Sequence, residues 1–237
     1  MLNSKKDTAT GTAMEPVGSG PILIDQVYQR ILESIANCTL PPGHRIRQGK
    51  LAESLGVSRQ PVSHALHLLK RQGLVRETGR QGLEVVPIDP VRIRQLYEVR
   101  GALDGTAARL AANRSARDHR GRAALEKRLT AGLKTTSETT LPARIRLDTE
   151  FHLALYRLSG NPSFEEIVEP HWPHLRRSMA TVLAAPDYRA RAWAEHAAIT
   201  ERVLEGDEVG AEQLAREHAI NAGLTTEERM GSVPSAA

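Results

Sequence analysis

Three histidines and one aspartate lie where predicted helices face inward, which makes them candidate metal ligands. Asp148 and His152 are four residues apart, so both lie on one face of a helix. His196 and His218 belong to two later segments, each flanked by apolar residues at helical spacing. Three imidazoles and a carboxylate suit Zn²⁺, Ni²⁺, Mn²⁺ or Fe²⁺ and leave coordination positions open for water or a ligand carboxylate. The alternative is a metal-free core in which the histidines are hydrogen-bonded.

A second group of polar residues lies on a predicted helix over 59–72, and its chemistry suits DNA. With the apolar stripe of this helix buried, the exposed side chains are Arg59, Gln60, Ser63, His64 and His67. In the major groove, arginine can form a bidentate pair with guanine, and glutamine can do the same with adenine. The start of the helix, with the Ser58 hydroxyl, suits a phosphate. The alternative for each residue alone is a solvated surface group.

The elements around this helix form a pattern known from DNA-binding proteins. Apolar spacing predicts helices over 22–37, 49–55 and 59–72, with Pro41-Pro42-Gly43 and Gly56 ending the first two. Two short strands over 74–77 and 83–86 flank a glycine-rich loop. This order predicts a winged helix-turn-helix, the wing being the strand hairpin.

Basic residues outside this helix favour the same partner. Residues 21–87 hold nine Lys and Arg against five Asp and Glu, so this region carries the entire formal net charge of +4. Within it, Arg80 at the hairpin tip and Arg45 and Arg47 on the flank could contact DNA phosphates or a neighbouring groove. A basic surplus in one domain beside a neutral remainder favours a polyanionic partner for that domain alone.

The rest of the chain is predicted to be an all-α antiparallel bundle, which makes the protein mainly α. A short linker over 87–90 precedes a long amphipathic helix that runs from Ile93 to Leu110. Further helices are expected over 116–135, 141–158, 162–184 (bent near Pro170 and Pro173), 188–205 and 207–226. The interior of such a bundle is a usual place for a ligand or a metal.

The expected organisation is therefore a tail, two domains and a second tail. The ranges are a flexible tail over 1–20, a winged helix-turn-helix domain over 21–87, a helical effector-binding and dimerisation domain over 90–226, and a flexible tail over 227–237. The first residues lack the apolar stretch of a secretory signal, and no apolar run is long enough to span a membrane. A cytoplasmic protein without a membrane partner is expected.

The first domain resembles that of a known family. The segment that carries the likeness reads PPGHRIRQGKLAESLGVSRQPVSHALHLLKRQGLVRETGRQGLEVVPI, and it resembles the DNA-binding domain of the GntR superfamily. The chain departs from the family pattern where Gln60 replaces a common threonine and Ser63 and His64 replace a common Arg-Glu pair. Because that arginine commonly contacts DNA in the family, Gln60 and His64 are expected to supply a different readout.

The second domain resembles the FCD domain of the FadR-type branch of this superfamily. The likeness rests on LYEVRGALDGTAARLAA and on the contexts of the four candidate ligands. It implies that Asp148, His152, His196 and His218 hold the metal and that a small organic acid completes the coordination. Arg100 matches an arginine of the family's first helix and could clamp the carboxylate, or form only a salt bridge. Asn221, one turn from His218, is a weaker candidate for the effector.

The resemblance also implies a function and an assembly. Members are homodimers that read pseudo-palindromic operators, and repression relieved by a ligand is their commonest mode. The sequence therefore predicts a sequence-specific, effector-controlled transcriptional regulator and not an enzyme. Two alternatives remain at this point: a metal-dependent hydrolase or lyase that uses the same Asp and His residues, and a regulator for which the metal itself is the signal.

Overall fold

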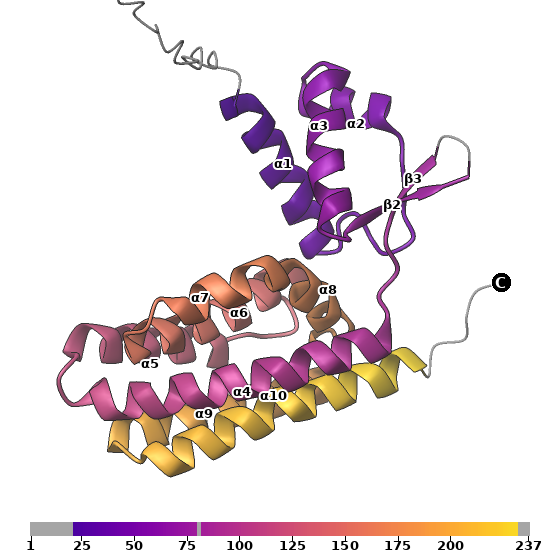
Figure 1. The fold of residues 1–237 in the computed structure, drawn as a ribbon. Coiled ribbons are helices and arrows are strands. Elements are labelled where there is room, and N and C mark those ends of the chain that lie inside the picture. Colours follow the sequence, from indigo (N-terminus) through magenta and orange to yellow (C-terminus); the bar gives the residue numbers. More distant parts are fainter. Residues whose placement is uncertain (1–20, 80–81, 232–237) are drawn as a thin grey trace, which may run out of the picture.

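The computed structural model describes residues 21–79 and 82–231, which form a small N-terminal domain joined by a short linker to a larger helical domain (Figure 1). Both predicted architectures are confirmed: a winged helix-turn-helix is followed by an all-α bundle. The predicted tail over 1–20, the wing-tip residue Arg80 and the end of the chain from 232 lie outside the described residues. Within the described ranges, no helix is both long and apolar enough to cross a membrane.

The N-terminal domain packs three helices against a small antiparallel sheet. Its elements are α1 (Pro21–Ala36), β1 (Arg45–Ile46), α2 (Gln48–Leu55), α3 (Arg59–Arg71), β2 (Val75–Thr78) and β3 (Gly82–Val85). The sheet order is β1-β3-β2, and Ile46 of β1 lies opposite Leu83 of β3. The sequence prediction missed β1, because two residues are too short a stretch to show an alternating pattern. The core is apolar and includes the fully buried Ile35, Leu69 and Val85.

Local sequence sets the angle between α2 and α3. Gly56 ends α2 with a left-handed backbone at φ 65°, a conformation that glycine adopts without steric cost. Ser58 occupies the N-cap position of α3 in an extended conformation, as expected, but its side chain makes no capping hydrogen bond. The N-terminal end of α3 therefore points away from the helical domain with its first backbone N–H groups uncapped by a side chain (Figure 1).

The C-terminal domain is a bundle built around two long antiparallel helices, α4 and α10 (Figure 1). Its elements are α4 (Pro90–Ser115), α5 (His119–Leu133), α6 (Leu141–Ser159), α7 (Ser163–Val168), η1 (Glu169–His171), α8 (Trp172–Leu183), α9 (Pro186–Glu205) and α10 (Glu208–Gly231). Gly101 and Gly105 let α4 approach α10 closely, since a Cβ atom at Gly105 would lie 3.0 Å from the Glu212 carbonyl oxygen. This close contact holds His218, the candidate ligand on α10, near Arg100 of α4.

Two boundaries differ from the sequence prediction. The helix expected over 162–184 is divided into α7, the 3₁₀ turn η1 and α8, because Pro170 and Pro173 each lack the N–H group that a continuous helix needs. The flexible tail expected from 227 is wrong for its first residues, since α10 continues to Gly231. Ion pairs of Arg94 with Glu227 and of Arg229 with Asp187 hold this last turn against α4 and α9.

Helix α8 connects the two domains. Arg176 on its outer side forms two hydrogen bonds, of 2.7 and 2.8 Å, with the Glu33 carboxylate of α1. Two residues earlier, the His174 Nε2 lies 3.1 Å from the Gln72 carbonyl oxygen at the end of α3. The inner side of α8 packs into the bundle core through Leu175 and Met179. Any movement of α8 within the bundle therefore bears on the placement of α1 and α3.

Candidate metal centre and DNA-binding face

The four predicted metal ligands come together in the bundle core from α6, α9 and α10. The Nε2 atoms of His196 and His218 are 3.1 Å apart. The Asp148 carboxylate lies 3.7 Å from His152 Nε2 and 3.9 Å from His196 Nε2. All four side chains are buried, and the three histidines present ligand atoms within 4.8 Å of one another. Residues on three separate helices thus aim their donor atoms at one point.

Two carboxylates orient the histidine rings from outside this cluster. Glu195 lies 2.6 Å from His218 Nδ1, and Asp104 lies 3.4 Å from His152 Nδ1. A proton on each Nδ1, facing a carboxylate, leaves the Nε2 lone pair free to face the cluster. A carboxylate behind a histidine is the usual arrangement in protein metal sites, because it fixes the tautomer and increases the basicity of the ligand.

The donor set fits a divalent transition metal. The Nε2 of His152 and the Nδ1 of His196 are buried without a hydrogen-bond partner. Burial, and then the neighbouring His218, His152 and Arg100 side chains, hold the pKa of His196 well below its usual value. A neutral imidazole is the form that binds a metal. Buried imidazoles without partners, converging with a carboxylate, favour a metal site over a hydrogen-bonded core.

Arg100 lies beside the cluster, as the effector prediction requires. Its guanidinium is 3.1 Å from Asp104 in a buried ion pair within α4, and its Nη2 has no partner. Asp104 also accepts a hydrogen bond from the Tyr156 hydroxyl. Although burial opposes the charged form, Asp104 raises the pKa of Arg100 further. Arg100 is therefore a permanent buried cation with one donor available for a ligand.

A small cavity separates Arg100 from the candidate ligands. It has a volume of about 10 Å³ and is lined by Tyr97, Arg100, Asp148, Met179, Val182, Leu183, Tyr188, His218 and Ala222. Asn221 does not line it: that residue is exposed, which corrects its sequence-based placement at the effector site. Asn221 is three residues after His218, so it lies about 60° around the helix from it, on the side of α10 that faces solvent.

The predicted DNA-contacting residues lie on one exposed face. Arg59, Gln60, Ser63 and His64 are all exposed along the first turns of α3, while Val62 and its apolar neighbours are buried. Such a helix, held by its apolar side and free on its polar side, can enter a major groove.

Arginines from outside α3 gather beside this face. A hollow of about 520 Å³ between α3 and the sheet is lined by Arg45, Ile46, Arg47, Gln48, Arg59, Gly82 and Leu83. Arg45, Arg47 and Arg59 form no ion pair with any described residue, so their charges are available to phosphates.

Sequence reasoning missed the carboxylates that orient the histidines. Glu195 directly precedes the predicted ligand His196, but its carboxylate reaches across to His218 on α10. Asp104 lies four residues after Arg100 on α4, so the pair could have been recognised as an ion pair on one helix face. That this face meets His152 depends on the packing of α4 against α6, which spacing within one helix does not reveal.

Comparison with known proteins identifies both domains. The chain matches the model of bacterial regulatory proteins of the gntR family over residues 23–85 and the FCD domain model over residues 95–221. The HTH-type transcriptional regulator YdhC of Bacillus subtilis (strain 168) is 30% identical over 195 residues, covering 81% of this chain and 86% of that protein. An HTH-type transcriptional regulator from an unstable DNA locus of Streptomyces ambofaciens is 31% identical over 199 residues, covering 81% and 80%.

Solved structures show the same fold. E. coli McbR/YncC superposes with a TM-score of 0.74 at 20% sequence identity, covering 88% of this chain and 98% of its own. The FCD match alone spans more than half of the chain, and the likeness to YdhC extends over both domains. Since the family and these relatives are transcriptional regulators, the metal-dependent enzyme considered from the sequence is rejected. The chain belongs to the GntR family of bacterial regulatory proteins, with a C-terminal FCD domain, and it is a DNA-binding transcriptional regulator.

Proposed function

We propose that a small organic acid, bound beside a divalent metal in the FCD domain, controls how tightly this regulator binds its operator, most simply as a repressor. The observation that carries the proposal is the convergence of Asp148, His152, His196 and His218, with the buried Nε2 of His152 lacking a hydrogen-bond partner. Zn²⁺, Ni²⁺, Mn²⁺ and Fe²⁺ all accept three imidazoles and one carboxylate. When bound, the metal would supply a Lewis-acidic anchor for the carboxylate of the effector.

Arg100 would hold the effector from the other side of the cavity. Its unpartnered Nη2 can donate to a carboxylate, and its pairing with Asp104 fixes the direction of the guanidinium. The cavity of about 10 Å³ holds no more than a water molecule or an ion in this conformation. An organic acid would therefore have to displace the side chains that close the cavity, among them Met179 and Leu183 of α8.

Displacement of α8 gives the pocket a route to the DNA-binding domain. Met179 and Leu183 face the cavity, whereas Arg176 on the same helix binds Glu33 of α1. A ligand shifts an equilibrium only by its different affinity for the two arrangements. Here the two arrangements would be a closed cavity with α8 as described, and an open cavity with α8 and the attached α1 displaced.

On DNA, the exposed residues of α3 would read base edges and the flanking arginines would hold phosphates. We assign base contacts to Arg59, Gln60, Ser63 and His64, and backbone contacts to Ser58, Arg45, Arg47 and Arg80. A homodimer would place two such helices on one face of the duplex, so the operator would be a pseudo-palindrome.

Elemental analysis of the purified full-length protein tests the metal site. One equivalent of metal per chain is expected, and Asp148→Asn and His196→Gln should lose it. His64→Gln, which removes an exposed histidine from α3, is the matched control and should keep it. A wild-type protein that binds none of the four metals when they are supplied would reject the site.

Selection of bound duplexes from random DNA tests the readout. The wild type should enrich a pseudo-palindrome, and Arg59→Ala and Gln60→Ala should each lose preference at separate base positions. Uniform weakening at all positions would instead show that these two residues contact phosphates. The selected duplex is also the reagent for measuring how metal and acid affect binding.

A further inference from the structure

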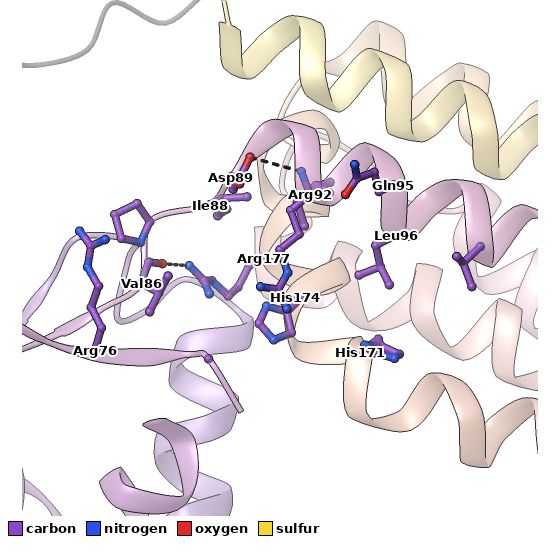
Figure 2. Close-up of a pocket in the computed structure, with 14 residues that line it drawn as sticks. Arg76, Val86, Ile88, Asp89, Arg92, Gln95, Leu96, His171, His174 and Arg177 are labelled. Carbon is purple, nitrogen blue, oxygen red and sulfur yellow. Dashed lines mark hydrogen bonds between the residues drawn. The ribbon is translucent and has the colours of Figure 1, made fainter. Parts of the chain in front are cut away.

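We propose that a cleft between the two domains is a second ligand site, which binds a small organic anion. The cleft has a volume of about 560 Å³, within the range of about 300–1,000 Å³ typical of small-molecule sites. Figure 2 shows side chains from the sheet, the linker, α4 and α8 around it. It shares no lining residue with the small cavity beside the metal ligands.

A buried arginine without a counter-ion carries the proposal. Arg177 of α8 is 2% exposed and lines the cleft. One of its guanidinium nitrogens donates to the Val86 carbonyl (Figure 2), but its Nε has no partner. No described carboxylate pairs with it, and burial lowers its pKa. A buried charge without a counter-ion is costly, and a bound anion would remove that cost.

A second arginine, Arg92, adds positive charge along the cleft. Arg92 extends from α4 toward His174 (Figure 2) and forms no side-chain ion pair with a described residue. Burial, and then the charges of Arg177 and Arg92, lower the pKa of His174 despite its hydrogen bond to the Gln72 carbonyl oxygen. The Asp89 carboxylate at the rim is engaged in capping α4, where it accepts from the Val91 and Arg92 backbone N–H groups. Asp89 keeps its charge, but Arg92 and Arg177 outnumber it and Arg76 is paired with Glu84, so the lining has a net positive charge that favours an anion.

The apolar part of the lining sets the size and character of the ligand. Ile88, Ile93, Leu96 and Val99 line the cleft on the linker and α4. An inorganic anion would leave this apolar surface exposed to water, whereas an oxyanion attached to an apolar group would bury it. The expected ligand class is thus a carboxylate or phosphate monoester that carries an aryl or short alkyl group.

Binding at this site would also depend on how the domains are placed. Arg76 and Val86 come from the DNA-binding domain, whereas Arg92 and Arg177 come from the FCD domain. An anion that contacts both sides favours the one placement in which they meet. By linkage, any change of DNA affinity caused by the anion must be matched by an equal change of anion affinity caused by DNA.

Titration with brominated probes tests the site in the full-length, metal-loaded protein. The probes are 4-bromobenzoate, 4-bromophenyl phosphate, and 4-bromobenzamide as the uncharged control. Calorimetry should show binding of at least one of the anions and none of the amide, and which anion binds distinguishes a carboxylate site from a phosphate site. Anomalous scattering of bromine in a crystal should place the probe in the cleft.

Variants separate this site from the metal pocket. Arg92→Gln and Arg177→Gln should each weaken binding about tenfold, as for loss of a charge-assisted hydrogen bond. Arg120→Gln, an exposed arginine at the start of α5, should leave binding unchanged. Arg92 is exposed, so its variant keeps the test valid if Arg177→Gln fails to fold. Binding that is lost in Arg100→Gln but unchanged in Arg92→Gln would place every anion at the metal pocket and overturn the proposal, as would no binding at all.

Discussion

The predicted DNA-binding face and the candidate metal centre use charged side chains in opposite ways. On the DNA-binding face, Arg45, Arg47 and Arg59 are exposed and form no ion pair within the described part of the chain. In the bundle core, Arg100 and Asp104 are almost fully buried and paired with each other. The exposed arginines of the first region are available to bind DNA. The buried charges of the second region bind each other and fix each other's position.

This difference separates the two kinds of mutational effect. When an exposed, unpaired arginine is removed, no other charged group loses an ion-pair partner. Folding should therefore be unaffected, while the affinity for DNA falls. Removing one member of a buried pair leaves the other desolvated and uncompensated, which costs stability first. The variants below test this separation, from the largest expected effect to the smallest.

Asp104→Asn should destabilise the protein by about 3–5 kcal/mol, the usual cost of breaking a buried ion pair. The substitution keeps the shape of the side chain but removes the charge that faces Arg100 and His152. Although burial would raise it, the Arg100 guanidinium holds the pKa of Asp104 below its usual range. Chemical denaturation measures the loss of unfolding free energy.

Glu98→Gln is the control, because it breaks a half-exposed ion pair with Arg94 on the same helix; it should cost below about 1 kcal/mol. Equal losses in the two variants would contradict the comparison.

Glu195→Gln should weaken metal binding about 10- to 100-fold, as is usual when the carboxylate behind a metal-binding histidine is removed. Glu195 is 2.6 Å from His218 Nδ1 and is not among the converging ligands. Competition with a chromophoric chelator measures the affinity. Glu201→Gln, an exposed position on the same helix, serves as the control. A metal affinity equal to that of the wild type would mean that Glu195 does not orient the ring.

Arg59→Ala should weaken operator binding by about 1–3 kcal/mol, the range for loss of a bidentate base contact. Because Arg59 is exposed, the unfolding free energy of the variant protein should stay within about 0.5 kcal/mol of that of the wild type. Fluorescence anisotropy with a labelled duplex and thermal denaturation give the two values. A variant that binds DNA normally but unfolds easily would reverse the roles of the two regions.

The contact between the domains should give the smallest effect. The hydrogen bonds from Arg176 lower the pKa of Glu33, so this pair stabilises the fold fully above the ordinary pKa of 4.5 and less as the pH falls through the lower, folded-state value. Since Glu33 is half exposed, the contribution should not exceed about 0.5 kcal/mol. Denaturation of wild type and Arg176→Gln at several pH values measures it. The difference should shrink at acid pH, and a difference that grows there would refute the assignment.

Sequence alone predicted those features that depend on residues near one another in the chain. The turn at Gly56, the exposed residues of α3 and the pairing of Asp148 with His152 on one face all follow from helical spacing. The three histidines were predicted as metal ligands because each lies among apolar residues at helical spacing. The prediction of α8 as part of one bent helix was close, since proline marks the break.

What spacing could not supply was the contact between helices. Glu195 and Asp104 orient their histidines only after α9 meets α10 and α4 meets α6. Asn221 looked suitable because it lies one turn from His218, but packing leaves it on the outer surface. Likewise, Arg177 is unremarkable in the sequence and becomes a buried charge only where the two domains meet. Tertiary packing determines these features, and the periodicity of residues within one helix does not predict how that helix packs against others.

The most direct test is the dissociation constant of the selected operator duplex in four conditions: chelated protein, metal alone, acid alone, and metal with acid. We expect a change of about 5- to 150-fold, the usual range of allosteric coupling, only when both metal and acid are present, and none in His196→Gln. A change with metal alone would make the metal the signal. Identical affinity in all four conditions would contradict control of DNA binding by the Asp/His centre.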